Sequence, residues 1–212
     1  MARLYHDASV EQSDLGDPQL NNPRQTNNLH ILGVGDLDVD LYLEVSHLPA
    51  RDEKIIARAF SKYPGGMVSN YLVSLQRLGA SCALQSVVGD DVEGAFALRT
   101  LAATGVDVSN VRTKLGATTF FCVVLIDASG EKALIGAPTS CIYPQETDLT
   151  ERSFQWATHL HLTAGNVVTA GVAVHLARKY GLTISLDLEM GQATASADLY
   201  DLLMSVDLLF LN

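Results

Sequence analysis

Strand and helix signals alternate along the chain from Leu29 onward, and this alternation limits the folds that the sequence can adopt. Short apolar runs that suit buried strands occur at 31–35, 82–88, 159–163, 182–188 and 207–211. Between them lie helical patterns, such as Val68, Leu72, Leu75 and Leu78 at three- and four-residue steps with Gly79 as a C-terminal cap. Strands joined by helices of this length form βαβ units. The sequence therefore predicts an α/β fold with a doubly wound, mostly parallel sheet.

Some strand signals interrupt this alternation. Two runs, 41–45 and 54–60, are separated by turn residues around Pro49. Later, a β-branched and aromatic run at 118–126 and a shorter run at 132–135 flank a Ser129-Gly130 turn, which indicates a hairpin. We therefore expect a small β-sheet appended to the main sheet, built from segments near 41–60 and 118–135.

Residues 1–28 differ in composition from the rest of the chain. They are rich in Asn, Gln, Asp and Pro, and they show no sustained hydrophobic period. We interpret them as a mobile N-terminal extension. Residues 29–212 are long enough and apolar enough to bury one core, so they are expected to form one α/β domain.

Charge and cysteine content exclude several classes of protein. The chain has 14 Lys and Arg against 24 Asp and Glu, a formal net charge of −10, and no basic cluster, which argues against nucleic acid as a partner. No apolar run is long enough to span a membrane, and the N-terminus lacks the pattern of a signal peptide. Cys82, Cys122 and Cys141 are widely spaced and odd in number, which suggests reduced, buried thiols in a cytoplasmic protein rather than disulfides or a zinc site.

The first candidate binding motif is acidic. Asp36, Asp38 and Asp40 alternate just after the strand expected at 31–35, and in an extended segment all three would point to one side. In open α/β sheets, ligands bind beyond the carboxyl ends of the strands. Carboxylates there would accept hydrogen bonds from sugar hydroxyls, although a solvated loop with ordinary turn acids is about equally compatible with this pattern.

The second candidate motif is Gly65-Gly66 followed by Asn70. Two glycines allow the backbone to approach a ligand closely, and the helix that follows directs free N–H groups toward it. Asn70 can donate to and accept from a neutral hydroxyl. The alternative is a simple helix-entry loop. No Gly-Lys-Ser/Thr follows, so this is not a P-loop.

Two other patterns carry less information about function. The Gly33-Val34-Gly35 segment lacks the third glycine of a dinucleotide-binding fingerprint, which makes a nucleotide-dependent oxidoreductase a weak alternative. His159 and His161 share a face of one apolar strand. Hydrogen-bonded buried histidines explain them better than a metal site, so no metal ligand is assigned.

Together these motifs resemble the PfkB, or ribokinase-like, family of carbohydrate and nucleoside kinases. The segment 35–40 resembles the family's opening strand with its sugar-binding Asp, and 64–70 resembles its Gly-Gly motif with Asn four residues later. The Gly89-Asp90-Asp91 turn with Gly94 beyond it, the 105–107 segment, the 185–187 segment and the closing 207–212 strand follow in the family's order. The similarity covers nearly all of residues 31–212.

This resemblance implies a ribokinase-like fold with a small β-sheet lid, and transfer of the ATP γ-phosphoryl group to a hydroxyl of a sugar or nucleoside. The residues that would bind the substrate are Asp38, Asp40, Gly65, Gly66 and Asn70. ATP and Mg²⁺ are the expected cofactors of the complete protein, and lids of such folds can pair in a homodimer.

The sequence departs from the family pattern at two points. Met67 stands where those relatives with true ribokinase character carry Lys after the glycine pair. The family's Gly-Ala-Gly-Asp motif, which supplies the catalytic base, occurs nowhere in the 212 residues. We therefore expect no catalytic residue and no C-terminal portion of the fold in this chain, which should be inactive alone. A sugar-binding sensor module is the alternative function.

Overall fold

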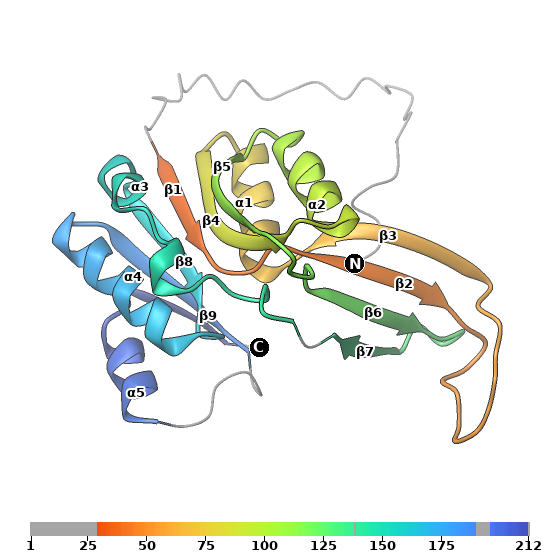
Figure 1. Cartoon of the computed structure of the whole chain (residues 1–212). Helices are drawn as coiled ribbons and strands as arrows, with labels where there is room; N and C mark the ends of the chain where they lie inside the picture. The colour runs from red at the N-terminus through yellow and green to blue at the C-terminus, as the bar shows by residue number, and fades with distance from the viewer. Residues whose placement is uncertain (1–28, 138, 190–195, 212) are drawn as a thin grey trace, which may run out of the picture.

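The computed structural model describes residues 29–137, 139–189 and 196–211, and its larger sheet, sheet A, is entirely parallel (Figure 1). Its strands follow the order β10-β9-β8-β1-β4-β5. They are β1 (His30–Val34), β4 (Ser81–Gly89), β5 (Asp107–Lys114), β8 (His159–Thr163), β9 (Thr183–Leu188) and β10 (Leu208–Leu211). The chain adds strands first on one side of β1 and then on the other. This reversal creates a crevice at the carboxyl ends of β1 and β8.

Helices cover both faces of sheet A, which explains why its central strands read as continuous apolar runs. On one face lie α1 (Met67–Arg77) and α2 (Val92–Ala102); on the other lie α3 (Glu151–Trp156), α4 (Val167–Lys179) and α5 (Ala197–Met204) (Figure 1). Side chains of β1 alternate between the two cores, with Ile31 on the α1 side and Leu32 on the α4 side. The expected doubly wound architecture is confirmed.

A second, four-stranded sheet B projects from sheet A in the order β3-β2-β6-β7 (Figure 1). Its strands are β2 (Asp38–Glu44), β3 (Ala59–Gly65), β6 (Phe121–Ile126) and β7 (Lys132–Gly136). The β2–β3 and β6–β7 pairs are antiparallel, and β2 and β6 are parallel. This is the appended sheet that the sequence predicts, including the hairpin around Ser129-Gly130.

Two elements differ from the sequence-based expectation. The strand expected at 54–60 is displaced, because the antiparallel register of β2 with β3 runs from Glu44 opposite Ala59 to Asp38 opposite Gly65. Strand β5 was not expected at all. Its sequence, DVSNVRTK, is largely polar because it lies at the edge of sheet A, where most of its side chains are partly or fully exposed. The expected N-terminal extension, residues 1–28, lies outside the described residues.

The described structure also bears on the cysteines and on membrane insertion. Cys82, Cys122 and Cys141 are all free and buried, as expected from their number and spacing. No helix within the described ranges is both long and apolar enough to cross a lipid bilayer.

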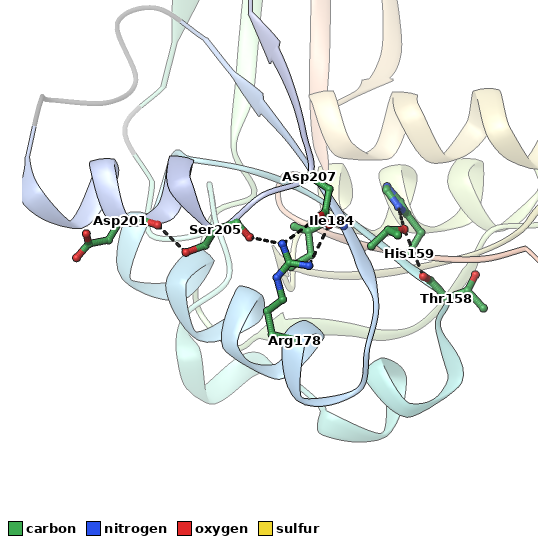
Figure 2. A network of polar contacts seen from close by, with 8 residues as sticks. Thr158, His159, Arg178, Ile184, Asp201, Ser205 and Asp207 are labelled. Carbon is green, nitrogen blue, oxygen red and sulfur yellow. Dashed lines mark hydrogen bonds and ion pairs between the residues drawn. The ribbon is translucent and has the colours of Figure 1, made fainter.

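An ion pair joins the last described elements (Figure 2). Both terminal nitrogens of Arg178, near the end of α4, donate to the carboxylate of Asp207 at 3.0 and 3.1 Å, and one also donates to the backbone oxygen of Ser205. Asp207 in turn accepts the backbone N–H of Ile184 at 2.7 Å. A bidentate Arg–carboxylate pair fixes orientation as well as distance, so it sets the position at which β10 begins beside β9.

A strip of hydrogen-bonded polar side chains runs along sheet A from the exposed Thr183 to the buried His161. Ser185 Oγ lies 2.7 Å from His159 Nε2 and 2.8 Å from His161 Nδ1, and Thr183 Oγ1 lies 2.7 Å from His159 Nδ1. The ring of His161 stacks on Tyr71 of α1, with centroids 3.5 Å apart. The two histidines are thus hydrogen-bonded buried side chains, as the sequence pattern favoured.

Candidate substrate-binding site

Asp38 and Asp40 lie on one face of β2 at the base of sheet B. Asp38 is buried and Asp40 is partly buried. Asp38 Oδ1 is fully buried and has no hydrogen-bond partner among the described residues. A buried carboxylate oxygen without a partner is costly, so it marks a place where a donor from outside the protein could bind.

The absence of a side chain at Gly65 leaves the space that the Asp38 and Asp40 carboxylates occupy. It pairs with Asp38 across β2 and β3, and a Cβ atom at this position would overlap Asp38 Oδ1 and lie 2.9 Å from Asp40 Cγ. Any larger residue would push the carboxylates aside. The structure therefore brings together Asp38, Asp40 and Gly65, three of the five residues predicted from sequence.

Gly66 connects this cluster to helix α1. It is the N-cap of α1 with φ 103°, a conformation that favours glycine, and a Cβ atom there would lie 2.5 Å from the backbone oxygen of Asp36. The Asp36 carboxylate accepts the backbone N–H groups of Met67 at 2.8 Å and Val68 at 3.2 Å. Asp36 thus caps α1 and holds the glycine pair against the end of β1.

This capping role corrects the prediction that three acids share one side. Strand β2 begins only at Asp38, and the chain bends at Gly35, so the carboxylate of Asp36 faces α1 instead of following Asp38 and Asp40. Only Asp38 and Asp40, the two acids inside strand β2, share one side as the alternation predicts.

Asn70 lies one turn into α1, and its side chain is exposed. Its backbone N–H donates to Gly66 at 3.1 Å. In the described part of the chain no hydrogen bond joins its side chain to Asp38 or Asp40. The Asn70 side chain is therefore accessible to a ligand, but it makes no hydrogen bond to the two carboxylates.

Burial and mutual repulsion make the acidic groups hard to ionise. Burial is the main cause that raises the pKa of Asp38 well above its usual value, and the charges of Asp36 and Asp40 raise it further. The pKa of Asp40 is also raised, mainly by burial and then by Asp36, although Lys132 acts in the opposite direction. A ligand that donates hydrogen bonds would relieve this desolvation.

Tyr143 is a site residue that sequence reasoning missed. Its ring packs so closely on Gly165 that any Cβ there would overlap the ring. Burial, followed by the charges of Asp36, Glu189 and Asp38, raises the pKa of the Tyr143 hydroxyl, which places it among these carboxylates. The Gly165-Asn166 step between a buried strand and a helix could have indicated this close approach, because it resembles the entry at Gly65-Gly66.

The Gly89-Asp90-Asp91 turn has a structural role. Asp91 is the N-cap of α2: its Oδ1 accepts the Gly94 N–H at 2.8 Å and its Oδ2 accepts the Thr119 N–H at 2.8 Å. Thr119 leads into β6. The turn therefore anchors sheet B to sheet A rather than contributing a ligand contact.

No group of three or more His, Cys, Asp or Glu side chains within residues 29–137, 139–189 and 196–211 is arranged to hold a metal ion. The site is instead a set of hydrogen-bond acceptors beside a glycine-lined helix start at the crevice of a doubly wound sheet. Fold and site together define a ribokinase-like α/β protein.

Comparison with known proteins agrees with this class. The family model described as "pfkB family carbohydrate kinase" matches residues 28–212. The chain belongs to this family. It is 32% identical over 186 residues to the ATP-dependent ribose-1-phosphate kinase of Halopiger xanaduensis, covering 87% of this chain and 62% of that protein.

Two solved structures show the same fold at lower identity. Arabidopsis thaliana ribokinase, complexed with ribose and ATP, superposes with a TM-score of 0.73 at 21% identity, over 87% of this chain and 60% of the other. Xylella fastidiosa fructokinase gives a TM-score of 0.72 at 22% identity, over 85% and 58%. The chain therefore spans about three-fifths of the length of these relatives.

Proposed function

We propose that this chain forms the acceptor-sugar site of an ATP-dependent carbohydrate kinase, with Asp38, Asp40, Gly65, Gly66 and Asn70 as the residues that contact the sugar. The observation that carries this proposal is the buried, unpartnered Asp38 Oδ1 beside Asp40. Sugar hydroxyls are neutral donors that would satisfy it without adding negative charge.

The site itself suits a sugar better than a nucleotide. Asp36, Asp38, Asp40 and Glu189 interact electrostatically in this region, and a triphosphate would be repelled by them. When bound, ATP with Mg²⁺ would supply the phosphoryl group at a separate position. The role of this chain's own residues is to orient the acceptor hydroxyl, while sheet B acts as a lid that excludes water.

Isothermal titration calorimetry with D-ribose, D-fructose and ribose 1-phosphate tests the proposal. We expect at least one of these probes to bind at millimolar concentration or tighter. Because no Gly-Ala-Gly-Asp is present, we also expect no sugar-dependent ADP formation from ATP by the 212-residue chain. Absence of binding by all three probes would contradict the sugar site.

The alternative of a sugar-sensing module is not favoured, because the relatives named above are all kinases. A cytoplasmic location is part of the same proposal, supported by the three free, buried thiols.

The uncompensated charge at position 38 leads to a stability prediction. Asp38→Asn keeps the shape of the side chain and removes the buried negative charge. We expect it to raise the free energy of unfolding by about 1–3 kcal/mol in urea denaturation at pH 8.5, because burial raises the pKa of this carboxyl and a raised carboxyl pKa costs the folded chain most at high pH. Glu44→Gln, an exposed acid on the same face of β2, is the matched control and should change little. A destabilised Asp38→Asn variant would show that this carboxylate is satisfied.

We further propose a homodimer through sheet B. The face opposite Asp38 and Asp40 presents a group of apolar side chains with Lys62 of β3 beside them: Leu41, Leu43, Phe60, Val123, Leu125 and Ile135. Helix α2 covers only its base, and Phe60 and Ile135 are 64% and 60% exposed. A second copy of the same face would bury them.

Sedimentation velocity tests this dimer. Phe60→Glu is expected to shift the chain toward monomer, because a charge would be buried in the paired faces. The matched control is Leu134→Glu, since Leu134 is 56% exposed but lies on the opposite face of β7. Association that persists in Phe60→Glu would assign self-association to another surface, such as the exposed side chains of β10.

A further inference from the structure

A small cavity lies beside Tyr143 at the carboxyl ends of β1 and β8. It measures about 10 Å³ and is lined by Val34, Gly35, Tyr143, Thr163, Asn166 and Thr169, with Pro144 and Ala170. A cavity of this size accommodates the centre of one water-sized group and nothing larger.

Two hydroxyl groups in the wall of this cavity have no partner. Thr163 and Thr169 are 4% and 2% exposed, and neither Oγ1 has a hydrogen-bond partner among the described residues. Asn166, another polar residue of this wall, is already engaged, because Asn166 Oδ1 accepts the Thr169 N–H and Asn166 Nδ2 donates to the Pro144 carbonyl. The two threonine hydroxyls are therefore buried hydrogen-bonding groups of the wall whose capacity is unused.

The charge around the cavity decides what kind of group fits. Asn166 is the N-cap of the 13-residue helix α4, whose positive end disfavours a cation. Asp36, Asp38 and Glu189 act on Tyr143 in the opposite wall and disfavour an anion. A neutral oxygen that both donates and accepts is the remaining choice.

We propose that this cavity binds a single neutral hydroxyl-type oxygen, held by the Thr163 and Thr169 hydroxyls. Such an oxygen can come from water or from a hydroxyl of the acceptor sugar. The second source rests on the proposed sugar-binding function, whereas the first does not. In both cases the bound oxygen supplies the Thr163 and Thr169 hydroxyls with the hydrogen-bond partner that no described protein group provides.

Urea denaturation of Thr163→Val and Thr169→Val distinguishes a filled cavity from an empty one by the sign of the effect. If water is bound, each variant removes one of its partners, so the denaturation midpoint falls, and the double variant loses less than the sum of the two. If the cavity is empty, each variant removes an unpaired buried hydroxyl, so the midpoint rises. Thr163→Ser, which keeps the hydroxyl, is the matched control for Thr163→Val.

Calorimetry with D-ribose separates the two sources of the oxygen. A lower midpoint with unchanged ribose affinity assigns the site to water, and ribose affinity reduced at least threefold in both valine variants assigns it to a sugar hydroxyl. Midpoints that rise together with unchanged affinity overturn the proposal. Failure of the wild-type chain to bind any sugar would refute the proposed function while leaving the midpoint test of the cavity valid.

Discussion

Replacing Asp40 with asparagine is expected to weaken sugar binding by about 10- to 100-fold, the largest change in affinity expected from a single side chain of this site. Hydrogen bonds to a charged acceptor contribute about 1.5–3 kcal/mol. Asp40 is only partly buried and lies beside Asp38 on the ligand-facing side of β2, so it is both accessible and preorganised. Calorimetry with whichever of the three sugars binds the wild-type chain measures the effect.

The control for this prediction is Glu44→Gln. Glu44 lies on the same strand and face four residues further along, where it is exposed, and its replacement should leave the affinity within twofold. A circular dichroism melt confirms that the Asp40→Asn variant is folded. An Asp40→Asn variant that is folded and binds the sugar as tightly as wild type would remove Asp40 from the site.

How far the sequence anticipates this site depends on how local each feature is. Asp38, Asp40 and Gly65 form one cluster because β2 and β3 pair in register, and the motifs at both positions were visible in the sequence. Asp36 was visible too, but its role depends on the bend at Gly35 and on the start of α1, which alternation along the chain does not reveal.

Residues brought in from distant segments could not be assigned from the sequence alone. Tyr143 reaches the site from the segment after β7 and is recognisable only from its packing against Gly165. The same holds for β5, whose polar sequence becomes a strand because β4 offers a parallel edge. Apolar periodicity identified the central strands because burial on both faces leaves a strong signal, whereas edge strands and long-range contacts leave a weak one.

Acidification is expected to destabilise the chain through His161, and the effect should be about 2 kcal/mol between pH 7.5 and pH 5.0. Burial, together with the neighbouring His159, lowers the pKa of His161 to about 3 from its ordinary value of 6.5. Below pH 6.5 the unfolded chain takes up a proton that the folded chain excludes. Stability from this group is therefore complete above pH 6.5 and falls by about 1.4 kcal/mol per pH unit as the pH drops toward 3.

The surroundings of His161 explain why the folded chain does not accept this proton. Tyr71 stacks on one face of the ring, Ser185 lies 2.8 Å from Nδ1, and Phe210 of β10 approaches edge-on with centroids 6.2 Å apart. His159, on the same face of β8, shares the Ser185 hydroxyl. No carboxylate contacts the ring in the described structure to stabilise an imidazolium, so protonation would place an unpaired charge in the core.

Other groups titrate in the same range, so the measurement must isolate His161. The raised pKa values of Asp36, Asp38 and Asp40 act in the opposite direction, because their protonation favours the folded chain as the pH falls.

Urea denaturation of wild type and His161→Asn at both pH values cancels these shared contributions. Asparagine can keep the contact to Ser185 but does not titrate, so the difference in unfolding free energy between the two proteins should shrink by about 2 kcal/mol at pH 5.0. The exposed His175, changed to Asn, provides the matched control and should show no such change. An equal difference at both pH values would contradict the prediction, because it would mean that His161 takes up a proton as readily in the folded chain as in the unfolded chain.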